Sequence, residues 1–213
     1  MKALNPAKRK FGNNQGFTLI EMAIVLVIIG VIIGAVVKGQ DLVENAKAKQ
    51  FASKLQAWQI AINTFYDRKG RYPGDSDRDG IIASSDTLTP LDDINSASFS
   101  SPPETSFSIG GVTFYAKLGN GNGKNYLAVC KDDTCNGTYT PTNSSDATAL
   151  KFFESFDTSI DGKADAINGT ILGLTGASAT AQQAKITGVT TSASNADWLN
   201  SSNTLKGLAY QIK

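Results

Sequence analysis

The chain has 213 residues, a formal net charge of +1, two cysteines and no histidine. Its length suits one folded domain with an anchor, and the lack of histidine excludes the usual serine and cysteine hydrolases, zinc hydrolases and histidine acid–base catalysis. Positive charge is concentrated in residues 1–16, which contain no acid and hold Lys2, Lys8, Arg9 and Lys10. The rest of the chain has no basic stripe, so nucleic-acid binding is not indicated.

Residues 17–37 form a long apolar segment in which Glu21 is the only charged residue. A helix of this length reaches about 30 Å, enough to cross the hydrocarbon core of a bilayer. No small-x-small cleavage signal follows the segment, and helix-compatible sequence continues directly after it. These residues alone predict a single-pass anchor with a cytoplasmic N-terminus and an exported body.

The stretch "GFTLIE" at residues 16–21, which follows the basic leader, resembles the class III signal of type IV pilins and type II secretion pseudopilins. The resemblance implies that residues 1–16 are a leader peptide and that a prepilin peptidase cuts between Gly16 and Phe17. The same enzyme would then methylate the new amine of Phe17. Before assembly the precursor would lie in the bacterial inner membrane.

The resemblance also implies a role for the apolar helix and its single acid. Residues 17–40 would form the core of a helical filament built from other copies of the chain and pilin-like subunits. The carboxylate of Glu21 would face the amine of Phe17 on a neighbouring subunit. A paired buried charge is tolerated where a lone one is costly, so this pair would set the register of assembly.

Residues 41–70 are predicted to continue as an amphipathic helix. Large apolar residues recur there at spacings of three and four, namely Phe51, Leu55, Trp58, Ile62 and Phe65. One apolar stripe of this kind predicts that the helix packs with a single face on the folded body. Gly70 and Pro73 are expected to end it.

The stretch "DSDRDGIIASSD" at residues 75–86 follows the pattern of a calcium-binding loop. Glycine stands at position 6, and oxygen ligands are predicted at positions 1, 3, 5, 7 and 12, which are Asp75, Asp77, Asp79, the carbonyl of Ile81, and Asp86. The alternative is a solvated Asp–Gly turn, which is common in proteins. A catalytic pair of carboxylates in this loop is not indicated, because nothing in the sequence around it predicts a substrate pocket.

Residues 71–213 are predicted to form a globular domain of short strands. A hairpin is expected around residues 110–111, further strands in residues 125–130, 184–191 and 205–213, and a short helix in residues 144–157 capped by Ser145 or Asp146. Residues 159–174 are expected to form a turn followed by a strand. The acids at 157, 161 and 165 are interpreted mainly as a turn, with a second calcium site as the alternative. If the domain is exported, Cys130 and Cys135 should form a disulfide, since zinc would lack ligands.

The predicted fold class is therefore α+β, with a long N-terminal helix packed on a small antiparallel sheet, as the resemblance to pilins implies. No catalytic constellation indicates an enzyme. The predicted function is a structural subunit of a type IV pilus-like filament at the cell surface. A type II secretion pseudopilin in a periplasmic pseudopilus is the alternative, and a membrane-tethered periplasmic binding domain that never assembles is a third reading from a different class.

Overall fold

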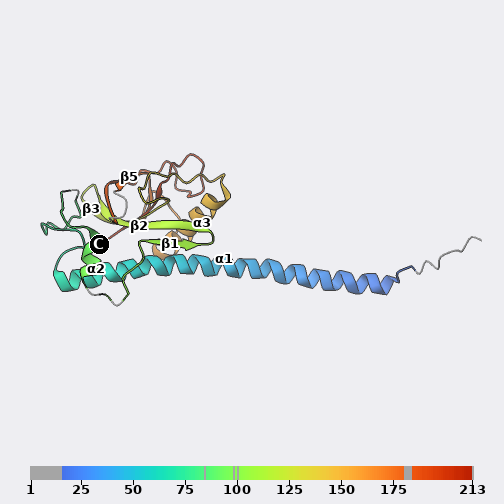
Figure 1. The fold of residues 1–213 in the computed structure, drawn as a ribbon. Helices are drawn as coiled ribbons and strands as arrows, with labels where there is room; N and C mark the ends of the chain where they lie inside the picture. Colours follow the sequence, from blue (N-terminus) through green and yellow to red (C-terminus); the bar gives the residue numbers. More distant parts are fainter. Residues whose placement is uncertain (1–15, 84, 98, 100, 180–183, 213) are drawn as a thin grey trace, which may run out of the picture. The chain divides into compact units, whose positions relative to one another are not determined.

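The computed structural model describes residues 16–83, 85–97, 99, 101–179, 184–212 (Figure 1). Nearly all of the predicted leader, residues 1–15, lies outside the described residues. The chain divides into two compact units, Met1–Glu44 and Asn45–Lys213. Each unit is described by itself below, although one helix, α1, runs through both of them.

Helix α1 spans Leu19–Lys69 and begins two residues later than the apolar segment. In the first unit, all residues from 19 to 38 are exposed, including the large apolar side chains. Among the described residues, α1 is the one helix long and apolar enough to cross a membrane by length and composition. The first unit therefore contributes an apolar surface and no core.

In the second unit, α1 packs through the predicted seam, whose five residues are each at most 1% exposed. Phe51 is central to this packing because its ring lies 5.1–6.1 Å from five other phenylalanine rings. The indole nitrogen of Trp58 donates to the carbonyl of Glu104 at 2.9 Å. The helix ends at Lys69, and Gly70 directly after it has a φ of +67° that favours glycine. Both the seam and the end of this helix are confirmed.

Seven strands form one sheet: β1 (Ser106–Ile109), β2 (Val112–Gly121), β3 (Lys124–Cys130), β4 (Ile171–Leu174), β5 (Gly176–Ala179), β6 (Lys185–Thr190) and β7 (Gly207–Gln211). The strand order is β4-β7-β3-β2-β6-β5, and β1 pairs with β2 beside this path. The α+β class is confirmed. The expectation of a purely antiparallel sheet is wrong, because β2 and β6 pair in parallel.

The parallel pair follows from the way the sheet closes. Only Thr175 separates β4 from β5, so one run of chain forms both ends of the strand order. Counted once, that run makes a ring of five with β7, β3, β2 and β6, and an odd ring cannot alternate in direction throughout. A Cβ on Gly119 would lie 1.9 Å from the carbonyl oxygen of Ile186, so β2 approaches β6 this closely only because glycine has no side chain.

Two helices complete the second unit, α2 (Pro90–Ser96) and α3 (Ser144–Asp161). Neither α2 nor β5 was expected from the sequence. The predicted cap of α3 is wrong, because the carboxamide oxygen of Asn143 accepts from the backbone nitrogen of Ser145 at 3.0 Å. Asp146 instead turns inward and pairs with Lys131 at 2.8 Å.

The two faces of the sheet pack into two different cores. The larger core lies between α1, α3 and one face, and takes Leu127 and Val129 from β3. The smaller core takes Tyr126 and Ala128 from the opposite face of the same strand. Cys130 and Cys135 form a disulfide in the smaller core, with both residues fully buried. The predicted disulfide is confirmed.

Candidate functional site

The Asp-rich loop that follows α1 gathers three carboxylates. Ligand oxygens of Asp75, Asp77 and Asp86 lie within 4.8 Å of one another, and this is the one such group among the described residues. Asp75 and Asp86 are buried, whereas Asp77 is exposed. The structure therefore brings together three of the four acids in the predicted calcium loop.

The other two predicted ligands have local partners. The Oδ1 atom of Asp79 accepts from the backbone nitrogen of Ile81 at 2.7 Å, outside the carboxylate group. The carbonyl of Ile81 accepts from the backbone nitrogen of Ala83 at 3.0 Å. Gly80 has a φ of +86°, in keeping with the sharp turn expected at position 6. These contacts are those of a tight turn.

The two buried acids differ in their electrostatics. Burial raises the pKa of Asp75, against hydrogen bonds from the backbone nitrogens of Arg78 and Gly80, and the charge of Asp86 raises it further. Burial also opposes the charge of Asp86, but hydrogen bonds from Ser76 and Ala83 outweigh it and lower the pKa of that carboxyl. The loop therefore places its two buried carboxyl groups next to its own N–H donors.

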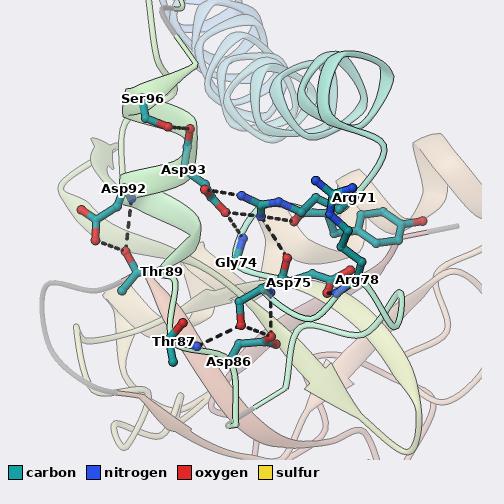
Figure 2. A network of polar contacts seen from close by, with 12 residues as sticks. Arg71, Gly74, Asp75, Arg78, Asp86, Thr87, Thr89, Asp92, Asp93 and Ser96 are labelled. Carbon is teal, nitrogen blue, oxygen red and sulfur yellow. Dashed lines mark hydrogen bonds and ion pairs between the residues drawn. The ribbon is translucent and has the colours of Figure 1, made fainter.

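A cluster around Arg71 fixes the beginning of this loop (Figure 2). Its guanidinium makes a bidentate ion pair with Asp93 of α2, at 2.6 and 2.8 Å, and also donates to the carbonyl of Asp75 at 3.0 Å. Asp93 accepts in addition from the backbone nitrogen of Gly74 at 2.7 Å. Planar bidentate pairs of this kind give strong geometric definition, so the loop is held between the end of α1 and α2.

A second anchor ties the loop to the sheet. The side chain of Asn125 in β3 donates to the carbonyl of Gly80 at 2.7 Å and accepts from the backbone nitrogen of Ile82 at 2.9 Å. Neither Asn125 nor the Arg71–Asp93 pair was found from the sequence, because residues 22 to 45 positions apart carry no local pattern. Carboxylate oxygens suit calcium, which takes six to eight oxygen ligands. Calcium in this loop stays a prediction.

The prediction of a turn at the acids 157, 161 and 165 is wrong for two of them, because Asp157 and Asp161 lie in the last turns of α3 and only Asp165 follows the helix. Asp157 is buried and its Oδ2 atom accepts from the indole of Trp198 at 2.8 Å and from the backbone nitrogen of Asp165 at 2.6 Å. Burial raises the pKa of Asp157 to about 6. The Oδ2 atom of Asp161 caps the backbone nitrogens of Thr170 and Ile171. Each acid thus supports backbone rather than a shared ligand.

At the start of α1, Thr18 and Glu21 satisfy each other's polar groups. The backbone nitrogen and hydroxyl of Thr18 donate to the Oε2 atom of Glu21 at 2.8 and 2.9 Å. The backbone nitrogen of Glu21 donates in return to the Thr18 hydroxyl at 3.3 Å. This is a capping box, in which the third helical residue reaches back to the residue before the helix. This local role of Glu21 was not predicted from the sequence, although T-x-x-E is the signature of a capping box.

Gly16 and Phe17, the predicted processing residues, are exposed and directly precede this cap. Residues 12–37 match the prokaryotic N-terminal methylation motif. The chain carries a prepilin-type signal. The motif and the exposed apolar helix together support a secreted pilin-like or pseudopilin subunit that is anchored in a membrane before assembly. No curated protein and no solved structure is significantly similar to the chain.

The prepilin-type signal covers residues 12–37 only, so the role of the remaining residues has to be inferred from the structure. Cleavage between Gly16 and Phe17, methylation of Phe17 and pairing of Glu21 between subunits stay predictions. The family of this motif is structural rather than enzymatic. The Asp-rich loop and its anchors lie wholly outside the matched residues.

Proposed function

We propose that the chain is a structural subunit of a type IV pilus-like filament on the cell surface. One observation carries the proposal: a prepilin-type signal leads directly into a helix whose residues 19–38 are all exposed. Contiguous apolar surface of this extent is not stable in water and must be covered by lipid or by protein. A subunit that leaves the membrane therefore needs other copies to cover the same surface.

In this proposal a prepilin peptidase removes residues 1–16 and methylates the amine of Phe17. The carboxylate of Glu21 exchanges its Thr18 contacts for the charged amine of Phe17 on a neighbouring subunit. A carboxylate in a water-poor filament core is tolerated only with a charged or strongly hydrogen-bonding partner. The pairing therefore favours one axial stagger between subunits, since any other leaves the charge without its partner.

The experiment is mass spectrometry of filaments sheared from cells, with the membrane fraction alongside. We expect a sheared species whose sequence begins at methylated Phe17, and its stoichiometry in the filament distinguishes a major from a minor subunit. Cells that lack prepilin peptidase are the matched control and should retain the chain in the membrane with its leader intact.

Two other outcomes identify the alternatives. A type II secretion pseudopilin shares the same signal and helix, so processed protein confined to the membrane fraction would indicate a periplasmic pseudopilus. Protein that still begins at Met1 in cells with an active peptidase would overturn both filament readings. That result would leave a membrane-tethered periplasmic domain.

A further inference from the structure

A cavity of about 270 Å³ opens on the second unit between α1, β7 and the end of α3. Ile62, Leu127 and Tyr210 contribute apolar surface to it, from α1, β3 and β7. Ile160 of α3 also lines the cavity and is 40% exposed, so apolar surface faces water there. The prepilin-type signal and the Asp-rich loop share none of these residues.

The polar groups of this cavity are all uncharged. Carboxamides come from Gln59 and Asn63 of α1 and from Gln211 of β7, and a hydroxyl comes from Thr170. Burial raises the pKa of the Tyr210 hydroxyl, and the charge of Asp161 adds to this, whereas a hydrogen bond with the side chain of Gln59 opposes it. Amides and hydroxyls both donate and accept, so the lining can satisfy ligand hydroxyl groups in either sense.

We propose that this cavity binds a single neutral sugar residue. The volume lies just below the range of pockets for drug-sized ligands, which suits a ligand of one ring. A sugar ring has apolar C–H faces and a rim of hydroxyls, matching apolar residues bordered by amides. A purely apolar side chain from a second copy would cover the carboxamide of Asn63 and the hydroxyl of Thr170 without bonding them, at a cost that a polyhydroxy ligand avoids.

Charge selectivity follows from the same lining. A carboxylate or ammonium group entering the cavity would lose hydration among described lining side chains that are all uncharged, and the ammonium of Lys124, which is not in the lining, already donates to the carboxamide of Gln211 at 3.4 Å. Neutral sugars should therefore bind, while sugar acids and amino sugars with a free ammonium group should not. The inference is independent of filament assembly, because every lining residue belongs to the second unit.

The test uses the full chain in detergent micelles and saturation-transfer NMR. The probes are methyl glucoside and N-acetylglucosamine, with glucuronate and glucosamine as charged counterparts. We expect transfer to a neutral probe with a millimolar dissociation constant, and at least tenfold weaker binding of its charged counterpart. Asn63→Phe should fill the mouth and abolish transfer, whereas Gln56→Phe, on an exposed position of the same helix outside the cavity, should leave it unchanged.

Thr170→Val provides a milder second variant, since it removes one hydroxyl and keeps the side-chain shape. It should weaken binding by several fold while the thermal unfolding of the chain stays unchanged. The inference is overturned if no neutral probe shows transfer, if Asn63→Phe and Gln56→Phe behave alike, or if glucuronate binds as well as the glucoside. Loss of filaments in Asn63→Phe without any sugar binding would instead identify a second copy as the occupant.

Discussion

The two halves of α1 have the same backbone conformation and opposite relations to their surroundings. Residues 19–38 are apolar on every side and none is buried. Residues 45–69 are apolar along one stripe, and that stripe is almost completely buried. A helix apolar all round needs lipid or a multi-chain core, whereas an amphipathic one needs only its own domain. The two halves of one helix thus lie in two different environments. Substitutions in the first half should impair filament assembly, and substitutions in the second half should destabilise the folded unit.

The largest effect is expected from Glu21→Ala in the first half. Removing the carboxylate leaves the Phe17 amine of a neighbour without its charged partner in the filament core. We expect sheared filaments to fall at least tenfold while mass spectrometry still finds the processed chain in the membrane. Asp41→Ala, at an exposed acid of the same helix, is the control and should assemble normally.

Glu21→Gln separates the two contacts proposed for this side chain. Glutamine can replace glutamate in a capping box, so the hydrogen bonds with Thr18 are kept while the charge is lost. If pairing with an amine sets the register, this variant fails to assemble as Glu21→Ala does. Normal filaments from Glu21→Gln would reduce Glu21 to a helix cap and contradict the assembly role.

In the second half, the corresponding substitution is Phe51→Ala. Its ring contacts five other aromatic rings in the larger core, and truncating a buried phenylalanine typically costs about 3–5 kcal/mol of unfolding free energy. Both tryptophans, Trp58 and Trp198, lie in the second unit, so their fluorescence reports its unfolding in urea. Ile32→Ala, at an exposed apolar residue, is the control and should leave that transition unchanged. Equal losses would contradict the separation of the two halves.

Local sequence patterns were sufficient to predict the difference between the two halves of α1. The seam repeats every three or four residues and Gly70 ends it, so the helix and its buried face could be predicted. The seven-residue α2 and the four-residue β5 are too short to show a period. The parallel pairing of β2 with β6 follows from closure of the sheet, which no local pattern contains.

The candidate sites divide in the same way. The resemblance of residues 16–21 to a known signal indicated the prepilin-type signal, and the spacing of the acids drew attention to Asp75, Asp77 and Asp86. Spacing could not indicate that Asp79 accepts from the backbone nitrogen of Ile81, because the same D-x-D-x-D-G pattern fits both a calcium-binding loop and a tight turn. Nor could it find the sugar-sized cavity, whose lining is assembled from α1, β3, α3, β7 and the connection before β4.

The unfolding free energy of the second unit should depend on pH through the carboxyl group of Asp157. Its pKa is raised from 3.8 to about 6 in the fold, so folding favours the protonated form. That contribution to stability is complete below about pH 4 and is lost as the pH rises through 6. Asp157→Asn keeps an acceptor for Trp198 and removes the charge, so it should gain on the order of 1–3 kcal/mol at pH 7 relative to the parent.

The measurement is urea unfolding at intervals from pH 4 to pH 7, where the variant should give the flatter profile. Asp165→Asn is the opposite control: burial opposes the charge of Asp165, but hydrogen bonds from Ile167 and Asn168 outweigh it and lower its pKa. Its replacement should reduce stability at pH 7. Parallel profiles for Asp157→Asn and the parent would show that burial of this carboxyl does not control its titration.

The smallest effect is expected from calcium, which should stabilise the second unit only. Free calcium at about ten times its dissociation constant adds about 1.4 kcal/mol, which raises the melting temperature of a chain of this size by a few degrees. Asp77→Asn removes an exposed member of the carboxylate group without touching the core, and should abolish the shift. Asp79→Asn should retain it, because that side chain already caps Ile81. If millimolar calcium leaves the melting temperature of the parent unchanged, the loop is a self-capped turn, in which Asp75 and Asp86 accept from the backbone nitrogens of residues 76, 78, 80 and 83.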